Sequence, residues 1–172
     1  MLCDLDQVPV YVGQSRDGIR KRVGRHLTSA RSDIIANRQI DVWEIAWVWS
    51  YPVAHREEIS PIEAVLYHHF DPQSQLMNGT VPPSPPSGLA IPDPAQRVQV
   101  MSDAEIAERR DPTQRLPRQA AHYAHIVGHF LVVKDSEQIA RAMRAHFQRL
   151  TKYHQVLLGL AEPDSADDDQ TD

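Results

Sequence analysis

A cluster of prolines divides this chain of 172 residues into two parts with different sequence patterns. Residues 81–88 read Val-Pro-Pro-Ser-Pro-Pro-Ser-Gly, and proline lacks the backbone donor that helices and sheet ladders need. We therefore expect an extended Pro-rich linker over residues 81–98. This linker would separate a domain at residues 1–80 from an α-helical region at residues 99–160.

Two runs in the first part have the composition of strands. Residues 8–12 and 42–49 are rich in β-branched and aromatic side chains, which suit the pleated, half-buried surface of a sheet. Between the two runs, apolar residues recur every four positions and indicate the buried stripe of a helix: Ile19, Val23 and Leu27.

Residues 60–63, Ser-Pro-Ile-Glu, are typical of the start of a second helix. Ser60 suits the N-cap, Pro61 suits the first helical position, and Glu63 lies where a capping box places its acid. The first part thus alternates between strand and helix patterns.

The second part has helical periodicity. Helices are expected near residues 102–110, 118–133 and 136–158, and they offer a surface for homo-oligomer formation. Residues 161–172 are acidic and have no large apolar side chain, so we expect a disordered tail there.

Charge is distributed unevenly along the chain. The net charge of −5 argues against a general affinity for nucleic acid. Residues 14–31, however, contain six basic residues and one acid, whereas residues 162–172 contain six acids and no base. The acidic end therefore hides a local basic segment. Within that segment, the residues assigned to nucleic-acid contact are Arg16, Arg20, Lys21 and Arg25.

The single cysteine, Cys3, excludes an intrachain disulfide and a zinc site built from several cysteines. Such sparing use of cysteine fits a reducing cytoplasm. No segment approaches the ~18 apolar residues of a membrane span. We therefore expect a cytoplasmic protein with no membrane partner.

Five side chains suited to catalysis on a phosphate occur in the first part, in this order: Tyr11, Arg22, His26, Glu63 and Asn78. Arg22 and His26 are one helical turn apart and share a face. A guanidinium there could hold a phosphate and offset the charge that develops when a P–O bond breaks. A carboxylate is a ligand that Mg²⁺ uses together with water and substrate phosphate, and a phenol could orient or deprotonate an attacking water.

In this order the residues resemble the motifs of the GIY-YIG nuclease family. Residues 11–15, Tyr-Val-Gly-Gln-Ser, are similar to its second motif, and Arg22 followed by Arg25-His26 is similar to its arginine-bearing helix. Residues 63–67 are similar to the segment of its metal-binding glutamate, and residues 76–78, Leu-Met-Asn, to its closing motif. The resemblance covers residues 1 to about 80.

The resemblance implies an α/β fold of the α+β type, with a small three-stranded antiparallel sheet flanked by helices. It also implies an endonuclease that hydrolyses DNA phosphodiester bonds with Mg²⁺ or Mn²⁺, the metal being held by Glu63. The residues it assigns to catalysis are Tyr11, Arg22, His26, Glu63 and Asn78.

The first motif of the family is missing. Its Gly-Ile-Tyr-like strand would fall at or just ahead of Met1, so the first-motif tyrosine is absent from this sequence. By this resemblance, residues 1–3, Met-Leu-Cys, are the remnant of that first strand. One hypothesis is a truncated gene model whose true start codon lies upstream, which Gly-x-Tyr-like codons in the upstream frame would support. The alternative is a catalytically inactive protein that kept the nuclease fold to bind nucleic acid or to regulate.

Each candidate residue also has a purely structural explanation. Glu63 could serve only the capping box, Tyr11 could pack in the core, and Arg22 with His26 could form a solvated helix face. Asn78 begins an Asn-Gly pair that is common in turns. A third interpretation is a structural interaction protein that uses its last long helix as a partner surface.

Overall fold

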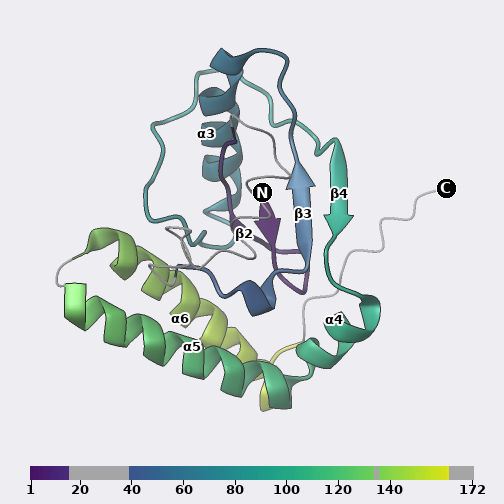
Figure 1. Ribbon diagram of the computed structural model, residues 1–172, viewed down its shortest axis with the longest axis vertical. Coiled ribbons are helices and arrows are strands. Elements are labelled where there is room, and N and C mark those ends of the chain that lie inside the picture. Colours follow the sequence, from purple (N-terminus) through teal and green to yellow (C-terminus); the bar gives the residue numbers. More distant parts are fainter. Residues whose placement is uncertain (16–38, 134–135, 163–172) are drawn as a thin grey trace.

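The sheet has four antiparallel strands in the order β2-β1-β3-β4, and helices flank it (Figure 1). The computed structural model describes residues 1–15, 39–133 and 136–162. The strands are β1 (Leu2–Cys3), β2 (Pro9–Tyr11), β3 (Trp47–Ser50) and β4 (Gln96–Gln99). The described helices are α3 (Ile59–Phe70), α4 (Asp103–Arg110), α5 (Pro112–Val133) and α6 (Glu137–Leu157), with two 3-10 turns, η1 (Val42–Glu44) and η2 (Arg56–Glu58). The mixed α+β class agrees with the expectation.

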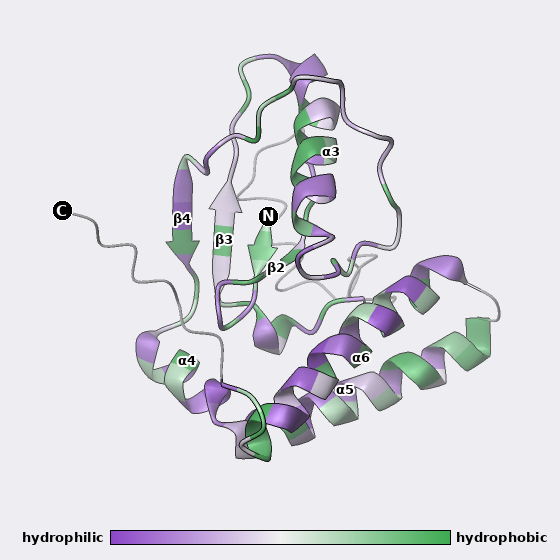
Figure 2. Ribbon diagram, turned by 180° about the vertical axis from the view of Figure 1, so that it is seen from behind, coloured by the Kyte–Doolittle hydropathy of each residue, from purple (hydrophilic) through white to green (hydrophobic). Residues whose placement is uncertain are grey.

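The sheet has four strands where three were expected, and β4 is the strand that the sequence patterns do not indicate. Residues 96–98 lie within the stretch expected as a linker and residue 99 begins the region expected to be helical, yet all four pair with β3, from Trp47↔Gln99 to Ser50↔Gln96. β4 is largely hydrophilic (Figure 2), and its one apolar residue, Val98, is 46% exposed. An edge strand held by backbone pairing, without an apolar face, shows no alternation in its sequence.

β1 and β2 form a hairpin whose turn is held by a buried aspartate. Oδ1 of Asp4 accepts from the amides of Asp6 and Val8, both at 2.9 Å, while Gln7 adopts a positive φ of 62°. The other side of β1 pairs with β3 through Leu2↔Val48. β1 therefore lies inside the sheet, and the strand expected at residues 8–12 is confirmed as β2.

Only the end of the aromatic run at residues 42–49 belongs to a strand. Its beginning forms η1, in which Asp41 caps the turn by accepting from the amide of Trp43 at 3.2 Å. The prediction of one continuous strand is therefore wrong. The turn directs Glu44 into the protein, where Arg115 donates to it, and this pairing is invisible in the local sequence.

α3 begins at Ile59, so the prediction that Ser60 is its N-cap is wrong. Oε2 of Glu58 already accepts from the amides of Ala54 (3.0 Å) and His55 (3.1 Å) in the turn that leads into the helix. Consequently Glu63 is not the acid of a capping box. Residues 64–67 of α3 are buried, and Leu66 and Tyr67 belong to a core cluster against which Ile62 and Phe70 also pack.

The core occupies both faces of the sheet. One cluster includes residues from β1, β3 and α3: Met1, Cys3, Val12, Trp49, Leu66, Tyr67 and Leu76. The second cluster includes a residue of α6: Leu2, Val10, Ile40, Ile45, Val48, Met77 and Ala145. Figure 1 shows α3 running alongside the strands and the α5–α6 hairpin crossing one end of the sheet. Among the described helices, none has both the length and the apolar character needed to cross a membrane.

Buried charged side chains connect the helices to the sheet. Arg115 of α5 donates to Glu44 from Nε (3.1 Å) and Nη2 (2.8 Å), and its Nη1 pairs with Asp6. Arg149 of α6 pairs with Asp4. We call these five residues the buried ion cluster. All five are nearly inaccessible to solvent, so their mutual pairing is what makes their burial tolerable.

His146 of α6 is buried as a neutral imidazole. Its Nε2 lies 2.9 Å from the carbonyl oxygen of Gln39, so we assign the ring proton to Nε2. The ring centroid lies 4.9 Å from that of His122. Burial lowers the pKa of His146 from the ordinary 6.5 to about 3.

Acidification is expected to destabilise the fold through His146. The unfolded chain binds a proton on this group at the ordinary pKa of 6.5, whereas the folded protein does so only at about 3. The stabilisation is therefore fully present above pH 6.5 and is lost as the pH falls, by at most about 1.4 kcal/mol per pH unit. Urea denaturation at a series of pH values measures the slope. His146→Phe should flatten the dependence of stability on pH. His154→Phe, an exposed control on the same helix, should leave it unchanged. Equal slopes in all three proteins would contradict the role of His146 in acid destabilisation.

Candidate active site

A cavity of about 820 Å³ lies between the beginning of α3 and the ends of β2 and β3. Its walls come from residues 11–15, 49–56 and 95–96, from Met1 and Leu2, and from the side of α3 that carries Ile59, Ile62, Glu63 and Leu66. These segments meet because β1 pairs with both β2 and β3 while α3 packs beside them. The cavity therefore collects residues that are far apart along the chain.

Tyr11 reaches the cavity from the last residue of β2, where it is the register partner of Leu2. Its ring lies close against Gly13: a Cβ built on Gly13 would be 2.6 Å from Cε1 of Tyr11 and 3.1 Å from the phenol oxygen. The absence of a side chain at Gly13 is thus what allows the ring to take this position.

Glu63 lines the same cavity from α3 and is half-buried. The next four residues, 64–67, are buried in the core, and this packing fixes the rotation of the helix that presents Glu63 to the cavity. Two residues predicted to be catalytic, Tyr11 and Glu63, therefore face one space.

Asn78 is placed beside the cavity and does not line it. Its Oδ1 accepts from the amide of Val12 at 3.1 Å, and its Nδ2 donates to the carbonyl oxygen of Val12 at 2.7 Å. The amide of Met77 also donates to the carbonyl oxygen of Val10 at 2.8 Å. The Asn78 side chain thus continues the pairing of β2 beyond its end and holds the wall segment that follows Tyr11.

The remaining residues predicted for the site lie outside the described residues. They are the two further catalytic candidates, Arg22 and His26, and the four residues assigned to nucleic-acid contact, Arg16, Arg20, Lys21 and Arg25.

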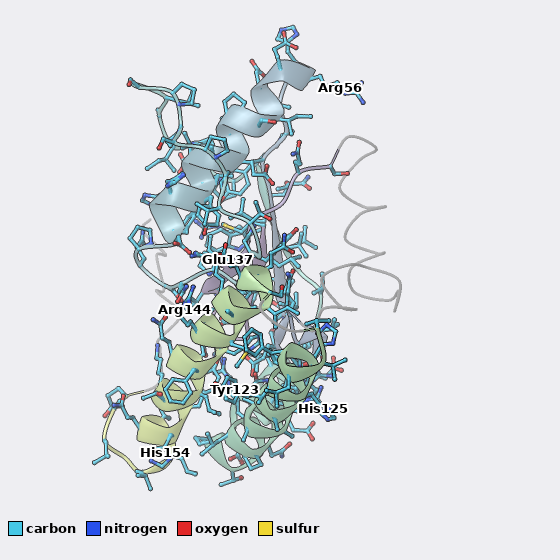
Figure 3. All side chains as sticks on the ribbon, turned by 90° about the vertical axis from the view of Figure 1, so that its left-hand side faces the viewer. Arg56, Tyr123, His125, Glu137, Arg144 and His154 are labelled. Carbon is cyan, nitrogen blue, oxygen red and sulfur yellow. The ribbon has the colours of Figure 1, made fainter. Side chains whose placement is uncertain are left out.

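Three cavity residues were not predicted from the sequence: Tyr51, His55 and Arg56. Figure 3 shows Arg56 projecting from the beginning of α3, at the end of the molecule opposite to His154. Burial raises the pKa of the Tyr51 phenol above its ordinary value, so this hydroxyl remains a hydrogen-bond donor. The sequence contains no signal for these three residues, because Tyr51 follows a predicted strand and the pair His55-Arg56 is followed by two glutamates before the predicted helix start.

The donor set of the cavity suits a cation that needs few protein ligands. In the part of the chain that the structure describes, no group of three or more His, Cys, Asp or Glu side chains is arranged to hold a metal. Mg²⁺ commonly uses one or two carboxylates, and completes its shell with water and substrate phosphate. The half-buried carboxylate of Glu63 fits that requirement, whereas a closed structural zinc site would need four ligands.

Comparison with known proteins found no match among protein family models, curated proteins or solved structures. The functional assignment therefore depends on the residues and geometry of the cavity.

Proposed function

We propose that this protein is a divalent-metal-dependent endonuclease that hydrolyses DNA phosphodiester bonds in the cavity between β2 and α3. The observation that carries the proposal is that Tyr11 and Glu63 line one cavity. A phenol and a carboxylate facing a common space can serve an attacking water and a metal-bridged phosphate, respectively. A reducing cytoplasm, where DNA and Mg²⁺ are both available, is the location we assign to it.

The proposed roles follow from the positions of the side chains. Glu63 would hold Mg²⁺ or Mn²⁺, which supplies positive charge next to the phosphoryl oxygens. Tyr11 orients the water whose oxygen forms the new bond to phosphorus. The bond from phosphorus to the leaving nucleoside oxygen breaks, and that oxygen takes up a proton in exchange for the one that the attacking water releases to solvent. Asn78 is a positioning residue, because it holds the backbone of Val12 next to Tyr11.

The sequence alone supports roles for the basic segment at residues 14–31. Arg22 would stabilise the charge that builds up on the phosphate, and His26, four residues later in the sequence, would assist it. Arg16, Arg20, Lys21 and Arg25 would contact the DNA backbone, and such contacts weaken as salt increases.

The test is nicking of supercoiled plasmid by the full chain with Mg²⁺, with Mn²⁺ and with EDTA. We expect metal-dependent conversion to the open circle, abolished by EDTA and by Glu63→Gln. Cleavage that Glu63→Gln leaves unchanged would overturn the metal assignment. Salt-sensitive DNA binding without any cleavage would instead favour the inactive nucleic-acid-binding alternative.

Gly13→Ala is expected to lower the cleavage rate by about 10²-fold, which is typical for a misplaced catalytic group. The added methyl would overlap the Tyr11 ring, 2.6 Å from Cε1, so the ring must move. Gly128→Ala is the control for a glycine substitution, since a Cβ at Gly128 meets nothing within 4 Å. Single-turnover nicking measures the rate, and a Gly13→Ala enzyme with the wild-type rate would show that the position of the Tyr11 ring is unimportant.

A further inference from the structure

The cavity is larger and more apolar than a phosphodiester group requires. Its volume of about 820 Å³ falls in the range of pockets that enclose whole small molecules. The apolar part of its wall includes Trp49, Tyr51, Ile62 and Leu66. An anionic phosphate gains nothing from such surfaces, whereas the flat face of a nucleobase does.

The wall also contains polar atoms that are buried and unsatisfied. Nε1 of Trp49 and Oε1 of Gln14 are each buried with no hydrogen-bond partner among the described residues. Trp49 itself is only 8% exposed. Unsatisfied buried polar atoms are uncommon and costly, so each one calls for an explanation. The unsatisfied donor of Trp49 and the unsatisfied acceptor of Gln14 belong to wall residues, and the polar edge of a base carries both kinds of complementary group.

Charge at the rim agrees with a nucleotide as the occupant. His55 and Arg56 are exposed residues on the cavity wall, so they can contact the phosphates on either side of a base that has entered. Glu63 and Tyr11 lie in the same wall. A base bound in the cavity would therefore be adjacent to the phosphodiester that the proposed chemistry attacks.

We propose that the cavity binds the base of an unpaired DNA nucleotide next to the scissile phosphate. The binding site stands on the wall described above, and its use in cleavage rests on the proposed nuclease function. A base in a regular duplex is stacked and paired, so it can enter such a pocket only after it leaves the stack. The preferred substrate is therefore DNA with an unpaired nucleotide.

The binding experiment uses the full chain carrying Glu63→Gln, so that the DNA stays intact, and fluorescence anisotropy with two labelled duplexes. One duplex has a single unpaired thymidine, and the other has an abasic residue in the same place. The phosphates are identical, so the difference in affinity reports the base. We expect the thymidine duplex to bind about tenfold or more tightly, as the loss of one stacked base would predict.

Two further changes test whether the cavity is responsible. Val53→Trp fills it from a half-buried wall position, and Tyr51→Leu removes an aromatic wall. Each should abolish the difference between the two duplexes, while Val81→Trp, at an exposed position outside the cavity, should preserve it. Equal affinity of the Glu63→Gln protein for both duplexes would overturn the base site, as would a difference that survives both Val53→Trp and Tyr51→Leu.

Cleavage by the wild-type chain with Mg²⁺ separates the two proposals. We expect the unpaired-thymidine duplex to be cut at least about tenfold faster than the abasic duplex and a fully paired one. Equal cutting of all three would overturn the base inference and leave the nuclease function standing. Base-dependent binding with no cutting of any duplex would overturn the nuclease function and leave the base site standing.

Discussion

Replacing Arg115 by methionine is expected to lower the free energy of unfolding by about 3–5 kcal/mol, the usual cost of removing one partner from a buried ion pair. The guanidinium contacts two buried carboxylates, Glu44 and Asp6. It also donates to the Tyr153 hydroxyl at 3.0 Å and lies 4.0 Å from the centre of that ring. Methionine preserves the apolar stem, leaves Glu44 without its bidentate cation and leaves Asp6 paired only with Arg110, 3.0 Å away.

The loss of unfolding free energy in Arg115→Met should be larger at high pH than at low pH. Burial raises the pKa of Glu44 to about 7 even with Arg115 beside it. Without the guanidinium the pKa rises further, so the folded variant holds a proton that the unfolded chain releases near the ordinary value of 4.5. Stability contributed by a raised carboxyl pKa is present at low pH and lost as the pH rises. The difference between the wild type and Arg115→Met is therefore larger at about pH 8 than at about pH 5.5.

Denaturant unfolding at the two pH values measures this effect. The matched control is Arg118→Met on the same helix, whose half-exposed side chain pairs with Asp41 at 3.0 Å. Asp41 is buried, but it keeps the Gln119 side-chain amide as a donor at 3.1 Å. Because the Arg118 guanidinium is itself half-exposed, its loss should cost less, about 1 kcal/mol. Similar losses for Arg115→Met and Arg118→Met would contradict the view that the buried ion cluster holds α5 to the sheet.

Glu63→Gln is expected to reduce the metal-dependent cleavage rate by about 10³-fold or more, in the range for removal of a group that stabilises transition-state charge. The substitution preserves the shape of the side chain and removes its negative charge. Since a hard divalent cation binds an amide oxygen less strongly than a carboxylate, the half-maximal Mg²⁺ concentration should also increase.

Glu57→Gln is the control for this change. Glu57 lies in η2 just before α3, is exposed, and is not among the residues that line the cavity. The Glu57→Gln protein should cut DNA at the wild-type rate and with the wild-type dependence on Mg²⁺ concentration. Thermal unfolding of both variants would show whether the fold is intact. A folded Glu63→Gln protein that retains full activity would mean that the metal is held elsewhere.

Part of the site could be predicted because its residues belong to locally patterned segments. Tyr11 ends a β-branched strand, and Glu63 lies near the start of an amphipathic helix, so their types and order were readable. The structure places both residues in the wall of one cavity, whereas Arg22, which the resemblance assigns to the same catalytic set, lies outside the described residues. The contributions of Tyr51 and Arg56 were not predictable, because an irregular turn between β3 and α3 brings them there.

The fold also has elements that could be predicted from the sequence and elements that could not. Strand β2 and the four described helices follow from side-chain periodicity or helix signals, although α5 begins at Pro112, earlier than the pattern indicates. β4 was missed because its hydrophilic residues 96–99 are held by backbone pairing to β3. The start of the 42–49 run was wrongly predicted to be strand. It forms η1, in which Glu44 accepts a hydrogen bond from the distant Arg115.

The sequence by itself determined where apolar periodicity builds strands and helices, because local propensity and burial pattern act over a few neighbouring residues. Only the tertiary structure decided which charged residues are buried. Asp4, Glu44 and Arg115 resemble ordinary solvated charges in the sequence, and each would be too costly to bury alone. Long-range packing brings them together, and their Coulombic attraction and hydrogen bonds then offset the loss of hydration.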